Sequence, residues 1–318
     1  MAVDLPTQMN GKDSLNGWDM LIAYNEDVLN TSLAERASEV PKLLTGLDPI
    51  PISDTGKTAP SSALCHAYSP LAIGVVDPIT RKTVVRYTAN IQLKTPRVSF
   101  DTSGFGSVGP ALVLVFPVTG SLTEPGTSVP IPDDLSLTCC TPLLYVSGST
   151  GTTTQPGQVV VFDPTQVSTQ NITLDFTKPS LKFTAPKGSA TDVVQYNIDI
   201  APRMVNHFVQ TGGLEYRLAG ITNAIPNSTT GNTTLQPSSF IFTLDPGEPS
   251  ATPAIPGALL TWISLVGSTS TPLHPDPRQS LLFSLGGMTP VSPLMPSSSA
   301  SIILAHNTMW SFFFKVSA

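Results

Sequence analysis

The sequence is poor in charge. Lys, Arg, Asp and Glu together make up 12% of its 318 residues, and the formal net charge at pH 7 is −6. Nucleic-acid-binding domains usually carry a basic face, whereas the densest basic group here is only Arg81, Lys82 and Arg86. The composition therefore argues against a nucleic-acid partner and against a polybasic membrane-binding patch.

Long apolar runs and paired cysteines are also missing. A transmembrane helix needs about 20 consecutive apolar residues, and the sequence has no such run, so we expect no integral membrane segment. Residues 1–14 lack the apolar stretch of a secretory signal peptide. The three cysteines are an odd set in which Cys139 and Cys140 are neighbours, which does not suggest a disulfide framework. These features predict a reduced, cytoplasmic protein.

Familiar catalytic and cofactor-binding motifs are absent as well. The four histidines show no H-x-x-x-H spacing, and there is no G-x-S-x-G, P-loop or C-x-x-C motif. Residues 104–109 read GFGSVG, the letters of a dinucleotide-binding loop, but that site needs a helix directly after the loop. A strand-like run, ALVLVF, follows instead. We interpret the segment as a glycine-rich hairpin turn, and we predict neither a metal nor a cofactor.

The chain does contain many turn residues and strand-forming runs. Hydrophobic residues make up 40% of it, beside 31 Pro and 23 Gly, which is typical of a turn-rich globular β protein and not of a disordered one. Polar and apolar side chains alternate in VVRYTANIQLK (84–94), NITLDF (171–176), VVQYNIDI (193–200) and LEYRLAGI (214–221). Alternation predicts half-buried strands. With the continuous apolar runs, we expect about a dozen strands, mostly antiparallel because their connections are short.

One helix is expected, close to the N-terminus. Asn25 is a favourable N-cap, Glu26 and Asp27 suit the positive end of a helix, and Pro41 ends it. The residues that recur at three- and four-residue steps are Val28, Leu29, Leu33, Arg36, Ala37 and Val40, and those of the polar back are Asp27, Asn30, Glu35 and Glu39. Before the cap, WDMLIAY predicts a short strand.

These elements predict an architecture. A long sheet with one dry face must close, pack on another sheet or curl around something, and the single helix is the obvious filler. We predict a mainly β (α+β) fold in which a long, strongly curved antiparallel sheet wraps around the N-terminal helix. Residues 1–318 are treated as one domain, and the Pro-rich loop at 120–133 and the Thr/Ser-rich loop at 147–157 are the candidate places for a subdomain junction.

Two segments resemble a known family. Asn16–Asp19 reads NGWD and is followed by an apolar strand and a helix with Val28–Asn30. This opening resembles that of the TULIP (tubular lipid-binding) superfamily, in particular the OrfX-type accessory proteins of clostridial neurotoxin clusters. Near the other end, a Pro-rich turn leads to Ser301–Leu304 and then to Asn307, Met309 and Trp310, which resembles a later segment of the same family. The middle of the chain agrees in strand pattern only.

The resemblance implies a helix wrapped by a bent sheet, with an apolar cavity for lipids or other hydrophobic molecules. Burial of apolar surface would hold such a ligand at about 25 cal/mol per Å². Our first hypothesis is therefore a protein that binds a lipid or another hydrophobic small molecule between the sheet and the helix. The candidate pocket residues are Trp18, Leu29, Leu33, Tyr87, Ile91, His207 and Tyr216. Of these, Trp18, Leu29 and Leu33 fit a simple core role better than a ligand-lining role.

Two other classes of function stay open. An enzyme of secondary metabolism could use the same pocket as a template for cyclisation, isomerisation or a pericyclic step, because such reactions need shape and one or two polar groups. Tyr87, His207 and Tyr216 are the candidates for those groups. A structural or assembly protein would instead show a large apolar patch and form a homo-oligomer.

Overall fold

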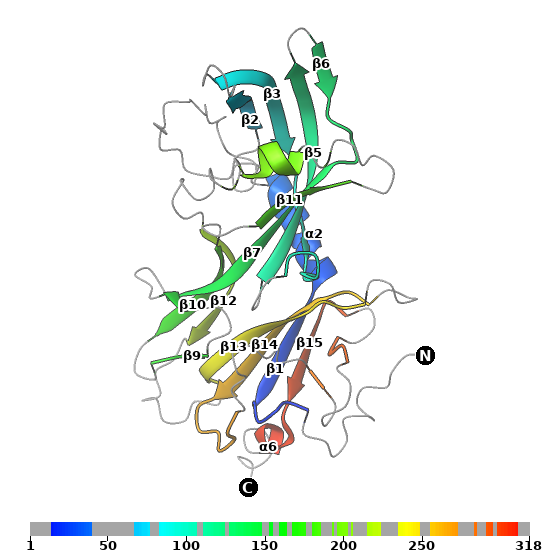
Figure 1. Ribbon diagram of the computed structural model, residues 1–318. Coiled ribbons are helices and arrows are strands. Elements are labelled where there is room, and N and C mark those ends of the chain that lie inside the picture. Colours follow the sequence, from blue (N-terminus) through cyan, green and yellow to red (C-terminus); the bar gives the residue numbers. More distant parts are fainter. Residues whose placement is uncertain are drawn as a thin grey trace.

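The protein is mainly β, as the computed structural model shows (Figure 1). The model describes residues 14–39, 67–76, 83–106, 111–124, 127–147, 153–154, 159–163, 167–175, 180–185, 193, 196–202, 205, 215–223, 235–248, 255–272, 283–284, 291–294 and 298–310. Its elements are β1 (Met20–Asn25), α2 (Glu26–Glu39), β2 (Ala67–Val76), β3 (Thr83–Leu93), β4 (Arg97–Ser99), β5 (Ala111–Glu124), β6 (Thr127–Pro130), β7 (Ser136–Ser147), β8 (Thr153–Thr154), β9 (Val160–Val161), β10 (Ser168–Asp175), β11 (Ser180–Thr184), the π-helical turn η1 (Tyr196–Ile200), β12 (Glu215–Asn223), β13 (Pro237–Asp245), β14 (Ala258–Leu265), β15 (Ala300–Leu304) and α6 (His306–Met309). The predicted mainly β (α+β) class is confirmed.

The strands form two antiparallel sheets, where the sequence suggested one long sheet. The five-stranded sheet has the order β15-β1-β14-β13-β9. The ten-stranded sheet has the order β12-β10-β7-β5-β3-β2, with β4 and β6 also paired to β5, and β8 and β11 also paired to β7. Figure 1 shows the five-stranded sheet in the lower half of an elongated molecule, with β2, β3, β5 and β6 at the opposite end.

Two long strands, β5 and β7, lie in the middle of the ten-stranded sheet. They pair with each other only from Ala111–Pro117 to Ser136–Pro142, and Pro117 and Pro142 stand at opposite ends of this shared ladder. Beyond Pro117, β5 pairs with β3 and β6, and beyond Pro142, β7 pairs with β10 and β8. Proline has no N–H to give to a ladder. The two prolines therefore mark the points where each strand exchanges its partners.

The N-terminal helix follows β1 without an intervening loop. The side chain of Asn25 caps it, because its Oδ1 accepts the backbone N–H of Asp27 at 2.8 Å. The predicted cap, the short strand before it and the helix are all confirmed. Pro41, the expected stop, lies outside the described residues, and the helix extends to Glu39.

Two apolar cores lie on opposite faces of the five-stranded sheet. All eight residues of β14 are buried, and its six apolar residues alternate between these cores. The main core joins both sheets and consists of Leu93, Val98, Phe100, Leu112, Leu114, Phe116, Val118, Ile131, Leu135, Leu137, Cys139, Leu143, Val160, Phe162, Phe183, Tyr196, Ile200, Ala201, Phe240, Phe242, Leu259, Ile263 and Leu265. The second core consists of Leu15, Trp18, Leu21, Ala23, Ile241, Ala258, Leu260, Trp262, Phe283 and Leu294.

Two local predictions were wrong and one was right. The expected strand at 193–200 is instead the turn η1, in which Tyr196 and Ile200 are buried and Ile198 is exposed. The expected loop at 120–133 contains the end of β5 paired with β6, because this polar, Pro-rich segment folds back as a hairpin. The glycine-rich segment before β5 does form a turn, at residues 103–106, with Gly106 at a φ of 58°.

Candidate functional site

Three partly buried apolar residues of β1 and α2 are the best candidates for contact with a ligand. Met20 and Ile22 of β1 and Leu29 of α2 pack against the main core but are only partly buried. We call these three residues the helix margin. They are all apolar, and they come from two consecutive elements, β1 and α2, which meet at Asn25. The margin offers apolar surface for contact and no group that could act as an acid, a base or a nucleophile.

Below the margin, the main core is filled by aromatic rings. The ring centroids of Phe162 and Phe240 lie 5.4 Å apart, and those of Phe240 and Phe242 lie 5.1 Å apart. A second pair, Phe183 and Tyr196, lies at 5.5 Å. Separations of this size are typical of packed aromatic pairs. These rings give the interior a hydrophobic character and a fixed shape.

Two asparagine side chains form hydrogen bonds with β4 and β11, the strands on either side of the β5–β7 ladder. Asn30 of α2 takes both backbone groups of Val98 in β4: its Oδ1 accepts the N–H at 2.6 Å, and its Nδ2 donates to the carbonyl oxygen at 3.0 Å. Asn197 of η1 binds Phe183 of β11 in the same way, at 2.6 Å and 3.0 Å. Since β4 and β11 flank the β5–β7 ladder on either side, each carboxamide takes the place of a further strand.

Glu26 holds the first turn of α2 against the end of β4. Its Oε2 accepts the backbone N–H of Phe100 at 2.9 Å, and its own N–H donates to the carbonyl oxygen of Gly257 at 2.9 Å. Burial raises the pKa of the Glu26 carboxyl, and the hydrogen bond from Phe100 opposes that shift. A Cβ at Gly257 would lie 2.7 Å from Oε2, so this junction requires glycine.

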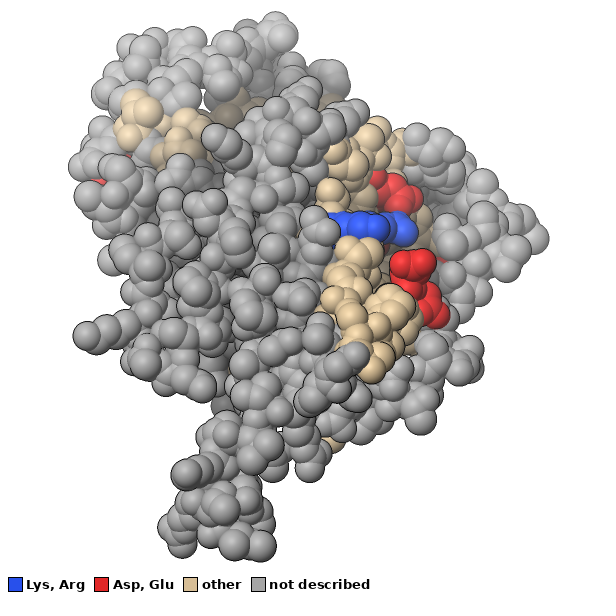
Figure 2. All heavy atoms as spheres, turned by 90° about the horizontal axis from the view of Figure 1, so that it is seen from above, with Lys and Arg blue, Asp and Glu red and all other residues tan. Residues whose placement is uncertain are grey.

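The charged side chains visible near this end of the molecule are of both signs. Figure 2 shows blue Lys and Arg side chains between red Asp and Glu side chains on the described part of the upper face.

Within the described residues, no group of three or more His, Cys, Asp and Glu side chains could hold a metal ion. None of the described helices is both long and apolar enough to cross a membrane. Burial raises the pKa of the Cys139 thiol, which disfavours the reactive thiolate.

Asp19 joins the two ends of the chain that carry the family resemblance. Its carboxylate accepts the backbone N–H of Leu265 at 2.8 Å and the hydroxyls of Ser268 and Thr308 at 2.6 Å and 3.0 Å. Its backbone carbonyl accepts the N–H of Ala305 at 2.9 Å. Asp19, which is only 2% exposed, therefore joins the NGWD segment to β14, β15 and α6.

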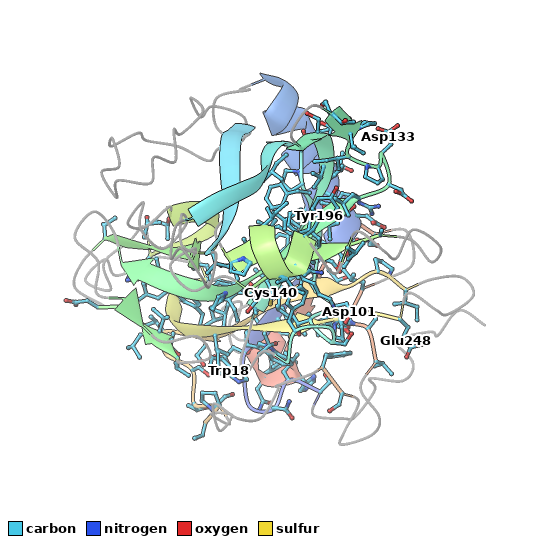
Figure 3. All side chains as sticks on the ribbon, turned by 45° about the horizontal axis from the view of Figure 1, so that its top comes forward. Trp18, Asp101, Asp133, Cys140, Tyr196 and Glu248 are labelled. Carbon is cyan, nitrogen blue, oxygen red and sulfur yellow. The ribbon has the colours of Figure 1, made fainter. Side chains whose placement is uncertain are left out.

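The structure describes the side chains of two predicted pocket residues, Trp18 and Leu29, and it places them in different parts of the interior. Trp18 is fully buried in the second core, on the opposite face of the five-stranded sheet from Leu29. Figure 3 shows Trp18 well apart from Tyr196 of the main core. For Trp18, a plain core role is the correct reading, and Leu29 keeps its candidate role at the helix margin.

The other predicted pocket residues have no described side chains. Leu33 belongs to α2, Tyr87 of β3 pairs with Ile73, Ile91 lies between Tyr68 and Gly120, and Tyr216 of β12 pairs with Leu174. His207 lies wholly outside the described residues. Their roles as pocket or catalytic groups stay predictions.

With this geometry in hand, the chain can be compared with known proteins. It is similar to P47 of Clostridium botulinum. The P47 structure from strain A2 matches with a TM-score of 0.48 and 12% identity, over 96% of this chain and 55% of P47. The structure of P47 from Clostridium botulinum E1 matches with a TM-score of 0.48 and 11% identity, over 93% of this chain and 54% of P47. The chain thus spans about half the length of these proteins. No protein-family description and no curated sequence matches it.

Sequence reasoning missed the residues that organise this region. Asn30 was placed on a solvent-facing polar back, but it is partly buried and binds Val98. Asn197 was placed in a strand, and Asp19 was noted only as part of a signature. Each binds backbone groups or hydroxyls far away in sequence, such as Val98 at a separation of 68 residues from Asn30. A single sequence contains no local signal for such partners.

Proposed function

We propose that this protein binds a lipid or another hydrophobic small molecule, with the helix margin of Met20, Ile22 and Leu29 as the contact surface. The observation that carries the proposal is that these three apolar residues pack on the main core and yet remain partly exposed. An apolar ligand laid over them would complete their burial. Each methylene group that it buries contributes about 0.8 kcal/mol.

Two further features support this ligand class. The core beneath the margin is almost entirely aliphatic and aromatic, so a polar ligand would find few partners there. The segments that form the margin and its support, residues 16–30 and 301–310, are those that resemble the tubular lipid-binding proteins. We extend that resemblance to a TULIP-like, OrfX-type mode of binding. We also place the function in the cytoplasm, which agrees with the free thiols of Cys139 and Cys140.

The first experiment looks for a bound ligand. The purified full chain is measured by native mass spectrometry and, after organic extraction, by lipid mass spectrometry. We expect an adduct of the mass of a lipid that disappears after extraction. The delipidated protein should then bind a fluorescent fatty acid with saturation. A folded protein with no adduct and no saturable binding to fatty acids, phospholipids or sterols would rule the proposal out.

The second experiment locates the binding surface. Leu29→Arg places a charge at the helix margin and should weaken binding at least tenfold, because the guanidinium would have to be desolvated by the ligand. Val167→Arg is the matched control: Val167 is 62% exposed and lies outside the margin, so this variant should bind like the wild type. Leu29→Ala removes apolar contact area without adding a charge and should also weaken binding. Equal binding by all four proteins would place the ligand elsewhere.

A further inference from the structure

Within the described residues, β15 is an edge strand of the five-stranded sheet and pairs only with β1. This edge differs from the other edges described above. Figure 1 shows β15 beside β1, on the side away from β13 and β14. The edge strands β4 and β11 of the ten-stranded sheet are each closed by an asparagine carboxamide. No such side-chain hydrogen bond to the backbone of β15 is seen from the described residues.

The backbone of β15 presents hydrogen-bonding groups to this edge. The N–H of Asn25 donates to the carbonyl oxygen of Ser299, and the N–H of Ala305 donates to that of Asp19. In an antiparallel ladder the direction of these groups alternates from one residue to the next. The backbone N–H and C=O groups of Ser301 and Ile303 therefore also point towards β1. Those of Ala300, Ile302 and Leu304 point outward.

The strand itself also lacks the residue types that normally prevent pairing at an edge. Natural edge strands are protected by charges, proline, bulges or a covering element, but Ala300–Leu304 reads ASIIL and contains no charge, proline or glycine. Ile302, in the middle of the strand, is 66% exposed. The opposite edge strand, β9, has only two residues and offers a much shorter ladder.

We propose that β15 pairs antiparallel with β15 of a second copy of this chain, which joins two five-stranded sheets across a two-fold axis at Ile302. A second copy suits this edge because the strand is complementary to itself. With Ile302 on the axis, Ile302 faces Ile302 of the partner subunit, and the small Ala300 faces the large Leu304. There is no charge in the strand to repel its copy. On the same face, Ile302 pairs with Ile22 of β1, so the apolar row continues from one subunit into the next.

The expected dimer is weak and depends on concentration. A stable interface usually buries about 1,200–2,000 Å², and five paired residues with their neighbours on β1 supply less than that. This proposal goes beyond ligand binding and does not depend on it, because the dimer forms through the backbone of β15, although Ile302 lies beside Ile22 of the helix margin.

The test is the mass of the full chain in solution, measured by light scattering over a range of concentrations. We expect the wild-type mass to rise from one copy towards two. Ile302→Lys places two ammonium groups against each other on the axis and should remain a monomer at every concentration. Val161→Lys introduces the same charge at the other edge of the sheet, where Val161 is 71% exposed, and should dimerise like the wild type.

A cross-linking experiment tests the register independently. In a Cys65→Ser background, Ile302→Cys should be joined into a covalent dimer by a short bis-maleimide, because the two Cα atoms would lie about 5.5 Å apart. Val161→Cys is the control and should be joined much less. A wild type that stays monomeric, a dimer that Ile302→Lys leaves intact, or equal cross-linking at both positions would each overturn the proposal, the last two in favour of another surface.

Discussion

At the scale of single residues, Asp19 joins distant parts of the chain. Its buried carboxylate accepts three hydrogen bonds, from the backbone N–H of Leu265 and from the hydroxyls of Ser268 and Thr308. Removal of an acceptor leaves buried donors unsatisfied, which costs more than the net value of each hydrogen bond.

Asp19→Ala should therefore lower the free energy of unfolding by about 3–5 kcal/mol. Asp19→Asn should cost less, because its Oδ1 still accepts, although its amide group meets the N–H of Leu265. Urea denaturation followed by circular dichroism measures both changes. Asp133→Ala, at an exposed position, is the control and should change stability by less than about 0.5 kcal/mol. Equal effects of Asp19→Ala and Asp133→Ala would refute the role of Asp19.

The buried carboxyl of Glu26 leads to a prediction about how folding stability depends on pH. Burial raises the pKa of its carboxyl above that of the unfolded chain, the hydrogen bond from Phe100 opposes the shift, and the Asp27 charge adds to it. A group with a raised folded-state pKa contributes stability below its unfolded pKa, and that stability is lost as the pH rises through the folded pKa. Glu26→Gln cannot titrate but keeps an oxygen for the N–H of Phe100.

The stability of Glu26→Gln relative to the wild type should therefore increase between about pH 4 and pH 7. Urea unfolding at several pH values gives this difference. Asp245→Asn should change in the same direction, because burial also raises the pKa of Asp245. A difference that decreases with pH would mean that the Glu26 carboxylate is stabilised by its surroundings, contrary to our interpretation.

At the scale of elements, the asparagine contacts of β4 and β11 can be separated by mutation. Asn30→Ala removes both hydrogen bonds to Val98, and Asn197→Ala removes both to Phe183. Each should cost about 1–3 kcal/mol, since a buried or half-buried backbone pair is left without its partner. Local opening should become easier at the affected strand only.

Amide hydrogen exchange distinguishes the two strands. Asn30→Ala should accelerate exchange at Val98 about tenfold or more while Phe183 changes little, and Asn197→Ala should do the reverse. Each variant is thus the control of the other. Uniform acceleration at both positions would show that these contacts stabilise the whole molecule and not their own edges.

Elements were predictable where the signal is local, and not where a distant partner decides. The cap at Asn25 and the strand before it depend on neighbouring residues, and both are as predicted. The alternation at 193–200 fits a strand, but Tyr196 and Ile200 are also four residues apart and can share one side of a helical turn. In the structure this segment forms a helical turn, and Asn197 in that turn is hydrogen-bonded to Phe183, 14 residues away. The same holds for Asn30, whose partner lies in another element.

At the scale of the whole molecule, the class of fold followed from composition and strand patterns, whereas the division into two sheets did not. The apolar runs predict many strands but do not say which strands pair. Pro117 and Pro142 mark where β5 and β7 change partners, yet the sequence has 31 prolines and no local feature distinguishes these two. The partly exposed helix margin was equally hidden, because partial burial depends on both sheets.

Because one main core joins both sheets, we predict that the two sheets unfold together. Phe183 lies in the ten-stranded sheet, whereas Trp18 and Trp262 are buried in the second core, on the far face of the five-stranded sheet. Tryptophan fluorescence therefore reports mainly on the five-stranded sheet, and far-UV circular dichroism reports on both sheets. For one cooperative unit the two signals should change at the same urea concentration. Phe183→Ala should destabilise by about 3–5 kcal/mol and shift both midpoints equally. If it shifts only the circular dichroism, the sheets are separate folding units, and the treatment of residues 1–318 as one domain is wrong.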